Sequence, residues 1–298
     1  MHSALEARLA KTGYFVLPAG ALTPSDLARP WQFAEQLSGE PPLMVERQVI
    51  RAVPEGRSFA STNGPTPLHN DLQLFRGRPA DLQVLVCVQP ATSGGTSLLL
   101  DSRLVVEALE QHDRALYSAV FEVPRAFPFI AGMVVAPTIA RFGEHIAFLH
   151  APRPAPNDPL FSKVMAQLEA HPPARIDLRA GEILVADNHR VLHGRTAFSD
   201  PRRELVRFLV WLRRARAVPA SIRSRARELP VSRAAHIEPT ERDVELVTRM
   251  VAGVSPGALA RKSGVAEPRL YALRDALFEV AREQLGDLRD VTVSSAAE

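Results

Sequence analysis

Two residues in one short segment have the spacing of paired metal ligands. His69 and Asp71 lie two positions apart within the segment 67–72. If this segment is a strand, residues two apart project from the same face, so both side chains would point at one spot. An imidazole and a carboxylate are two of the three ligands of the facial triad that holds non-haem Fe(II) and leaves coordination positions open.

The pair alone is weak evidence, because the tripeptide is common. With 9 His and 33 acidic residues in 298, about one His-x-Asp/Glu is expected by chance. The chain contains two, and the other runs from His236 to Glu238. No histidine follows that second copy, so it cannot complete a triad in the usual order. The first copy has a later partner in His193, which would supply the third ligand.

His189 and His193 also have the four-residue spacing of a helical zinc motif. Arg190 stands where that motif needs its glutamate, and the flanking residues are typical of strands. We therefore reject a helical zinc site here.

Two arginines further along the chain predict an anion site. On a strand, Arg203 and Arg207 would share one face with Leu205, Leu209 and Trp211. A buried arginine is costly unless it is paired. Because few carboxylates are placed to neutralise these two, an anionic ligand is the expected partner, and a dicarboxylate cosubstrate would meet the need.

Taken together and in order, these residues and three further pieces resemble a known superfamily. The chain is similar, over residues 1–216, to the γ-butyrobetaine hydroxylase and taurine dioxygenase superfamily of Fe(II)/2-oxoglutarate-dependent oxygenases. The further pieces are Leu82-Gln83-Val84-Leu85, then Gly94-Gly95-Thr96-Ser97 leading to Asp101, and Asp187-Asn188 before Leu192-His193-Gly194-Arg195.

The resemblance implies a distorted double-stranded β-helix, the jelly-roll or cupin-like fold, with Fe(II) held by His69, Asp71 and His193. The family often carries threonine in the middle of the His-x-Asp tripeptide, where this chain has Asn70. On a strand Asn70 would face away from the metal. Related halogenases vacate the carboxylate position for chloride, so the retained Asp71 favours hydroxylation, while desaturation and epoxidation stay open.

The resemblance also implies 2-oxoglutarate and O2 as cosubstrates. Arg203 would bind the distal carboxylate of 2-oxoglutarate, and Ser97 or Thr96 would form a hydrogen bond to the same group. Arg207 would lie near the keto-acid end or the substrate. Because iron and cosubstrate carry the redox chemistry, no separate general base or other catalytic residue is expected.

The elements that must position these residues are many short strands with a few helices, which predicts an α+β fold with one closed or sandwiched β core. Most strand candidates are bounded by Gly, Pro, Asn or Asp. We expect strands at Tyr14–Leu17, Leu43–Val53, Leu82–Val88, Thr96–Leu100, Gly132–Ala136, Ile146–Leu149, Arg175–Leu178, Ile183–Ala186 and Leu205–Leu212, and helices at Ala4–Lys11, Ser25–Leu37, Leu104–Gln111 and Leu160–Ala170. Substrate contacts are expected from loops at Glu55–Thr66, Ala126–Ile130 and Ala151–Pro159.

The chain changes character after residue 216. Residues 217–239 are rich in Ala, Arg, Pro and Ser and predict a linker, and residues 240–298 predict a small helical unit. Within this unit Ala260, Gly264, Val265 and Leu270 resemble a helix-turn-helix with 267–277 as recognition helix. The stretch 217–298 has twelve basic and twelve acidic residues, whereas a DNA reader normally shows a basic face. A helical cap over the pocket or over a neighbouring subunit is therefore favoured over nucleic-acid binding, and a homo-oligomer stays open.

Composition excludes several other classes. The chain is 46% hydrophobic and 23% charged, which is ordinary for a globular protein, and it has no apolar run long enough to span a membrane. Cys87 is the only cysteine, which excludes a disulfide framework and multi-cysteine metal sites. Lys11 precedes any apolar run, so we expect no signal peptide and a cytoplasmic location. The net charge of +3 comes from residues 1–216, where we expect Arg203 and also Arg207 to bind small carboxylates.

The sequence therefore predicts an Fe(II)- and 2-oxoglutarate-dependent dioxygenase. It would hydroxylate an unactivated C–H bond of a small polar metabolite, an amino acid or a derivative, and release succinate. The alternative is a DNA-binding regulator whose jelly-roll domain senses 2-oxoglutarate or iron. A third hypothesis, a structural jelly roll without activity, is disfavoured because all three metal ligands are present.

Overall fold

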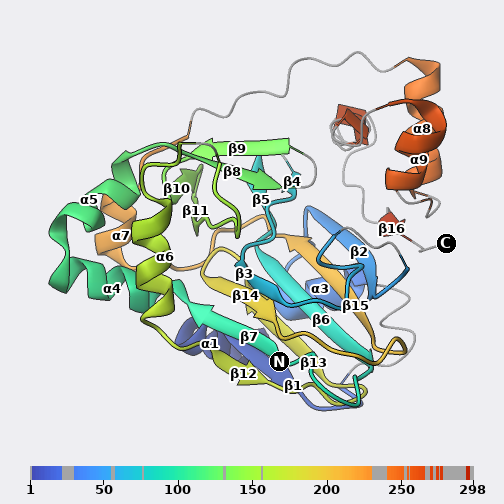
Figure 1. The fold of residues 1–298 in the computed structure, drawn as a ribbon, viewed down its shortest axis with the longest axis horizontal. Helices are drawn as coiled ribbons and strands as arrows, with labels where there is room; N and C mark the ends of the chain where they lie inside the picture. Colours follow the sequence, from blue (N-terminus) through green and yellow to red (C-terminus); the bar gives the residue numbers. More distant parts are fainter. Residues whose placement is uncertain are drawn as a thin grey trace.

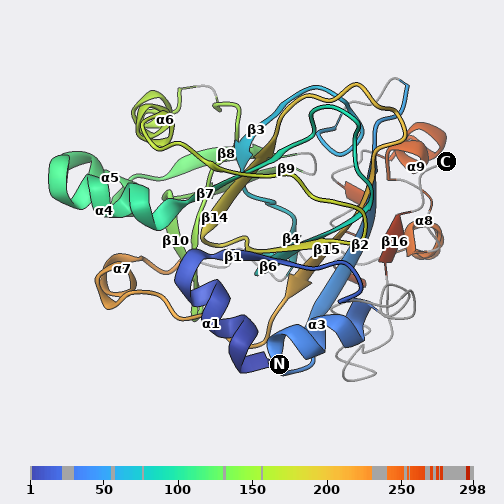
Figure 2. The same cartoon turned by 90° about the horizontal axis from the view of Figure 1, so that it is seen from below.

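The computed structural model places the chain in two facing antiparallel sheets with helices around them (Figures 1 and 2). This α+β architecture confirms the predicted fold class. The residues that the structure describes are 2–21, 30–54, 58–75, 77–129, 132–155, 157–229, 240–251, 254, 256–265, 269–270, 273–274, 276–277 and 293–295.

The larger sheet has six strands in the order β1-β13-β6-β15-β2-β16, and the smaller has four in the order β12-β7-β14-β3. Neighbouring strands are antiparallel, except that β16 runs parallel to β2. The bounds in the larger sheet are β1 Tyr14–Leu17, β2 Met44–Arg51, β6 Leu82–Gln89, β13 Ile183–Asp187, β15 Glu204–Trp211 and β16 Val293–Ser295. Those in the smaller sheet are β3 Thr66–His69, β7 Ser97–Asp101, β12 Ala174–Ile176 and β14 Val191–Arg195.

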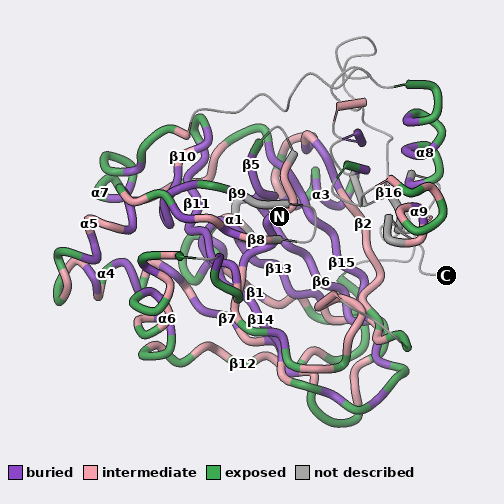
Figure 3. The backbone as a smooth tube through the Cα atoms, turned by 45° about the horizontal axis from the view of Figure 1, so that its top comes forward, coloured by how far each residue is buried: buried purple, intermediate pink, exposed green. Residues whose placement is uncertain are grey.

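Strand β15 shows why both faces of the larger sheet are covered. Val206, Phe208 and Val210 point to one side, where they pack with helices α1 (His2–Thr12) and α3 (Pro30–Ser38). Leu205 points to the other side and packs with residues of the smaller sheet. The central strands β6, β13 and β15 are therefore buried along most of their length, as the purple centre of Figure 3 shows. This sandwich fixes the faces on which the functional side chains lie.

A second group of helices covers one end of the sandwich, on the left of Figure 1. Asp101 and Asp113 cap the first two, since their side chains accept hydrogen bonds from backbone N–H groups of the first turn. The helices are α4 Ser102–His112, α5 Arg114–Glu122, α6 Phe161–Glu169 and α7 Ala220–Arg225. Three hairpins lie among them and beside the sheets: β4 Leu74–Phe75 with β5 Arg78–Pro79, β8 Arg125–Phe129 with β9 Gly132–Ala136, and β10 Ile139–Phe142 with β11 His145–Phe148.

The C-terminal segment contains helices α8 (Glu241–Val251) and α9 (Pro256–Ser263), whose apolar residues pack together. Strand β16 pairs with β2, and Arg274 forms an ion pair with Glu46 of β2 at 2.9 Å. A strand from this region therefore completes the edge of the larger sheet, and the division of the chain into an oxygenase domain, a linker and a helical unit stays a prediction. The recognition helix expected at 267–277 lies partly outside the described residues.

The elements expected from the sequence are found with small shifts at their ends. The start expected for the second helix, at Ser25, lies outside the described residues, and the described helix α3 begins at Pro30. Two expectations differ. The segment expected as a linker contains α7, whose Ile222 is buried against the α4–α6 group, while residues 230–239 are outside the described part. The loop expected at 126–130 lies mostly in strand β8, because Phe127 pairs with Val134 in a hairpin. None of the described helices meets the length and apolarity needed to cross a membrane.

Candidate active site

Two histidines face each other across neighbouring strands of the smaller sheet. His69 ends β3 and His193 lies in the middle of β14, and the two are register partners with ring centroids 4.4 Å apart. Gly194 follows His193, and a Cβ at that position would lie 2.6 Å from the carbonyl oxygen of Thr66. Glycine is thus required for the close approach of β14 to β3 that brings the two imidazoles together.

Asp71 reaches the histidines by a different route from the one expected. Strand β3 ends at His69, so strand alternation does not aim the Asp71 side chain. Asn188 holds it instead: its Oδ1 accepts from the Asp71 N–H at 2.9 Å, and its Nδ2 donates to the Asp71 carbonyl at 2.9 Å. Asn70 is buried and donates to the Asn188 carbonyl at 2.7 Å, while its Oδ1 accepts from the His150 N–H. A pair of buried asparagines therefore fixes the turn that carries Asp71.

The potential ligand atoms of His69, Asp71 and His193 all lie within 4.8 Å of one another. His69 Nδ1 lies 2.9 Å from the carbonyl oxygen of Pro67, an acceptor only, so Nδ1 carries the proton and Nε2 keeps its lone pair. Gln83 Nε2 donates to His193 Nε2 at 2.8 Å and to Asp71 Oδ2 at 2.5 Å. The buried His193 Nδ1 has no hydrogen-bond partner. His193 Nε2 thus turns its lone pair toward Asp71, whose Oδ2 lies 3.6 Å away.

Burial and charge hold these groups in the protonation states that a metal requires. Burial by itself raises the pKa of Asp71, but Arg207 and the two histidines outweigh it and lower the pKa to about 2. Burial lowers the pKa of His193 to about 3 and also lowers that of His69. At neutral pH the cluster is one carboxylate and two neutral imidazoles, which are the ligand forms that bind a metal.

The two arginines expected at an anion site both line the cavity beside the histidines. Arg207 donates to Asp71 Oδ1 at 2.5 Å and to Gln48, and its buried Nε has no partner. Arg203 lies over the Phe198 ring at 4.8 Å and makes one long bond, 3.3 Å, to the Gly95 carbonyl. Its buried Nη1 has no partner. Within the part of the chain that the structure describes, Arg207 therefore has a carboxylate partner inside the site and Arg203 has none.

The glycine turn before β7 shapes the position of Arg203. Gly95 has φ +77°, and a Cβ there would lie 2.7 Å from Arg203 Nε. Only glycine suits that conformation and lets the guanidinium pack against the turn. Ser97 is buried and lines the same cavity, whose volume is about 70 Å³. Thr96 is buried too, but it lines a neighbouring pocket on the other side of Arg203.

The segment after residue 57 forms one wall of the cavity. Phe59 and Ala60 line it, and the Phe59 ring lies 5.2 Å from that of His69. Arg195 holds this wall because Nη2 donates to the carbonyls of Thr62 at 2.9 Å and Gly64 at 2.6 Å. The part of the expected loop 55–66 that the structure describes therefore borders the histidines.

These residues fit a non-haem Fe(II) centre with an oxo-acid beside it. Two neutral imidazoles and one carboxylate from two segments, the end of β3 and strand β14, converge on one point and leave the cavity side open, as the facial triad requires. Among the described residues no carboxylate pairs with the buried Arg203 guanidinium, which is a costly arrangement unless an anion binds there.

Sequence reasoning missed the roles of Gln83, Asn188 and Arg195. Gln83 and Asn188 belong to the segments that carry the family resemblance, which was the available signal, but neither residue was given a task. Some of their partners lie more than 100 positions away along the chain, as in the bonds of Gln83 to His193 and of Asn188 to Asp71. Such pairings follow only from the tertiary structure.

Comparison with known proteins places the chain among oxygenases. Residues 26–209 match the model of the family described as taurine catabolism dioxygenase TauD, TfdA family. The chain is 31% identical over 171 residues to γ-butyrobetaine dioxygenase of Pseudomonas sp. (strain AK-1), covering 51% of this chain and 44% of that protein. It is 25% identical over 177 residues to dioxygenase str8 of Strobilurus tenacellus, covering 51% and 39%. The matched part thus spans less than half the length of these relatives.

Solved structures show the same fold. An asparagine oxygenase in complex with Fe(II), 2S,3S-3-hydroxyasparagine and succinate superposes with a TM-score of 0.54 at 19% identity, over 70% of this chain and 79% of that one. A taurine dioxygenase from Burkholderia xenovorans gives 0.50 at 17% identity, over 70% and 80%. These likenesses confirm the double-stranded β-helix fold.

Proposed function

Because the chain belongs to the TauD/TfdA family of taurine catabolism dioxygenases, we propose that it is an Fe(II)- and 2-oxoglutarate-dependent dioxygenase. It hydroxylates an unactivated C–H bond of a small polar metabolite. One observation carries the proposal: two neutral imidazoles and a carboxylate converge beside a cavity that also holds an arginine without a carboxylate partner. When bound, Fe(II) would supply O2 activation, with 2-oxoglutarate oxidised to succinate and CO2.

In this proposal His69, Asp71 and His193 hold the iron. Gln83 and Arg207 each donate to one carboxylate oxygen of Asp71, which fixes the orientation of the ligand. Arg207 also keeps Asp71 ionised. The proposed chemistry needs no further acid or base from the protein, whose remaining task is to orient groups and exclude water.

The cosubstrate lies on the arginine side of the cavity. Arg203 binds the distal carboxylate of 2-oxoglutarate, and Ser97 donates its hydroxyl hydrogen to the same group. Thr96 is the weaker candidate, because it lines the neighbouring pocket. The free Nε of Arg207 is available to the keto-acid end or to the substrate.

The substrate enters beside Phe59 and Ala60, the apolar wall next to His69. An apolar wall excludes water from the reacting C–H bond. The relatives act on small polar molecules by name, γ-butyrobetaine and taurine, and a structural neighbour is bound to 3-hydroxyasparagine. These names support an amino acid or an amino-acid derivative as the substrate class.

Succinate release tests the proposal. Purified protein with Fe(II), ascorbate, 2-oxoglutarate and a panel of amino acids and their derivatives is expected to form succinate in a substrate-stimulated way, and His69→Ala is expected to abolish it. A sequence-specific DNA gel shift modulated by 2-oxoglutarate, without turnover of any member of the panel, would contradict it. The comparisons do not support that DNA-binding alternative. The homo-oligomer and the cytoplasmic location stay predictions.

A further inference from the structure

The described residues contain a second cluster of two histidines and one aspartate, separate from the proposed iron site. Asp81 precedes β6, His145 begins β11, and His189 lies in the turn between β13 and β14. Their potential ligand atoms also lie within 4.8 Å of one another. All three are buried, with Asp81 0% exposed and both histidines 7% exposed. The proposed oxygenase chemistry uses none of them.

The hydrogen bonds of this cluster leave two acceptors facing each other. His189 Nε2 lies 3.0 Å from the carbonyl oxygen of Pro79, which can only accept, so Nε2 carries the proton. His189 Nδ1 therefore keeps a lone pair, and it lies 3.7 Å from Asp81 Oδ1. A cation between these two atoms would stabilise both.

The remaining polar contacts are those expected around a metal ligand set. Asp81 Oδ2 accepts from Arg78 and from the Leu212 N–H, which leaves Oδ1 facing the imidazoles. His145 Nδ1 donates to Asp81 Oδ1 at 2.6 Å, and Arg78 Nη1 lies 3.2 Å from the same nitrogen. Shifting the His145 proton to Nε2 of the same ring would give Nδ1 the lone pair that a metal needs. A ligating histidine usually donates its other N–H to a backbone carbonyl, as His189 does.

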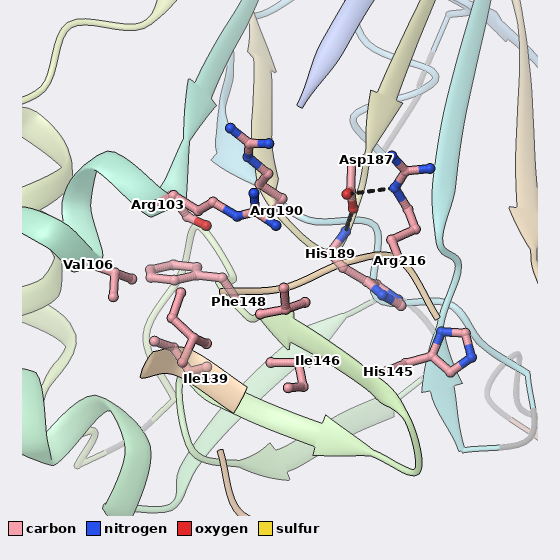
Figure 4. A pocket seen from close by; sticks show the side chains of 13 residues that line it. Arg103, Val106, Ile139, His145, Ile146, Phe148, Asp187, His189, Arg190 and Arg216 are labelled. Carbon is pink, nitrogen blue, oxygen red and sulfur yellow. Dashed lines mark hydrogen bonds and ion pairs between the residues drawn. The ribbon is translucent and has the colours of Figure 1, made fainter. Parts of the chain in front are cut away.

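The cluster borders a cavity of its own, which is large enough for water. His145 and His189 line it together with the ion pair of Asp187 and Arg216 (Figure 4). Its volume of about 40 Å³ exceeds what one water needs. Three protein ligands and one water make the four-coordinate set that Zn²⁺ adopts with nitrogen and carboxylate ligands.

The charges around this cavity argue against a second oxygenase centre. Arg190 is paired with Asp101 at 2.5 Å, and Arg216 is paired with Asp187 and Glu6. Arg103 donates to the Ala217 carbonyl at 2.8 Å. Each arginine lining the cavity thus has a partner already, so the cavity offers no guanidinium like that of Arg203 for an oxo-acid.

We propose that Asp81, His145 and His189 bind one divalent transition-metal ion of the zinc type, with a structural role. The ion would join three segments that are distant in sequence, and metal binding free energy adds to folding free energy in such a site. His189 directly follows Asn188, the residue that holds Asp71. The second ion would therefore stiffen the turn that positions a ligand of the first.

Metal stoichiometry tests this proposal without relying on turnover. Metal-free full-length protein is titrated with Co²⁺ as the probe, and bound metal is counted by elemental analysis and by visible d–d absorption. The wild type is expected to bind two equivalents. Two double variants, H69A/H193A and H145A/H189A, are each expected to retain one. His112→Ala, at an exposed position outside both clusters, is the matched control and is expected to retain two.

A thermal readout keeps the proposal testable if H145A/H189A fails to fold. In H69A/H193A, added Zn²⁺ is expected to raise the melting temperature, and the further change Asp81→Asn is expected to weaken Zn²⁺ binding more than about 100-fold, beyond the cost of losing an outer hydrogen bond. One equivalent of Co²⁺ in the wild type, or a Zn²⁺ shift in H69A/H193A that survives Asp81→Asn, would overturn the proposal. These readouts count bound metal and melting temperature, so a failure to detect succinate would bear on the proposed function and not on the second site.

Discussion

The two His₂–Asp clusters of this chain contain the same side chains in different surroundings. In the first, both oxygens of Asp71 accept hydrogen bonds from side chains that line the cavity, Gln83 and Arg207, and an unpaired guanidinium lies nearby. In the second, Asp81 is fully buried, and the arginines of the adjoining cavity are all engaged. The ligand types are equal, so the charges around them must decide what each cluster does.

The proposed catalytic centre is therefore distinguished from the second cluster by a nearby guanidinium without a carboxylate partner, that of Arg203, and not by its ligand set. A metal with a free guanidinium beside it can receive a dicarboxylate, whereas one surrounded by completed ion pairs can only be held. The two centres meet at Asn188, whose Nδ2 donates to the carbonyls of both Asp71 and Ala80, each at 2.9 Å. A substitution within one cluster should therefore affect that cluster alone, whereas a substitution of Asn188 should affect both clusters.

The largest expected contrast comes from removing one imidazole from each cluster. His193→Ala takes away a proposed iron ligand and should reduce succinate formation by more than about 100-fold, beyond the loss typical of an outer partner. His145→Gln should leave the rate at saturating Fe(II) in the wild-type range. Initial rates at saturating 2-oxoglutarate measure both. Equal losses in the two variants would show that the clusters are not functionally distinct.

A substitution of Arg203 should weaken the binding of 2-oxoglutarate at the first cluster. Arg203→Leu removes charge-assisted hydrogen bonds worth about 1.5–3 kcal/mol, so the KM for 2-oxoglutarate should rise about 10- to 150-fold. The neighbour Arg202 is the control: its side chain is 72% exposed and is paired with Asp200, so Arg202→Leu should leave the KM unchanged. A KM that responds equally to both changes would place the carboxylate elsewhere.

A substitution of Asn188 should weaken metal binding at both clusters. Asn188→Ala removes hydrogen bonds to Asp71 and Ala80, and we expect Fe(II) affinity to fall about 10- to 100-fold, as when an outer partner of a ligand is lost. Co²⁺ binding to the second cluster should weaken as well. Asn188→Asp keeps an acceptor for the Asp71 N–H and should lose less. Unchanged Fe(II) affinity in Asn188→Ala would mean that the turn holds Asp71 without it.

Acid should affect the metal-free forms of the two clusters alike. Burial raises the pKa of Asp81, but His189, His145 and Arg78 outweigh it and bring the pKa to about 2, below its ordinary 3.8. A carboxyl with a lowered pKa contributes stability that is present above its unfolded value and lost as pH falls toward the folded one. Between about pH 4 and pH 2 the free energy of unfolding of Asp81→Asn should therefore fall by about 2 kcal/mol less than that of the wild type.

Urea unfolding of chelator-treated protein across this pH range measures the effect, and Asp71 should behave the same way, since its pKa is also about 2. Parallel acid limbs for wild type and Asp81→Asn would show that Asp81 is not ionised in the folded state.

The sequence predicted the fold and named the residues that converge on the site, because these depend on local pattern and on order along the chain. Strands such as Tyr14–Leu17 and Gly132–Ala136 were placed to the residue. Asp71 was placed on a strand wrongly, since nothing local shows that β3 stops at His69 and that a distant asparagine holds the turn after it.

The second cluster could not be predicted for the same reason. Asp81, His145 and His189 come from three separate segments with no common spacing, and only the packing of β11 beside the β13–β14 turn brings them together. His189 was considered with His193 as one helical motif, but the two belong to different clusters. Strand β14 begins at Val191, so His189 lies in the turn before the strand and His193 lies within it.

Anomalous diffraction from crystals loaded anaerobically with Fe(II) and 2-oxoglutarate tests the central claim most directly. We predict an iron peak between His69, Asp71 and His193, with the far carboxylate of 2-oxoglutarate at Arg203. An iron peak at Asp81, His145 and His189 with none at the first cluster, or 2-oxoglutarate bound away from Arg203, would contradict the account.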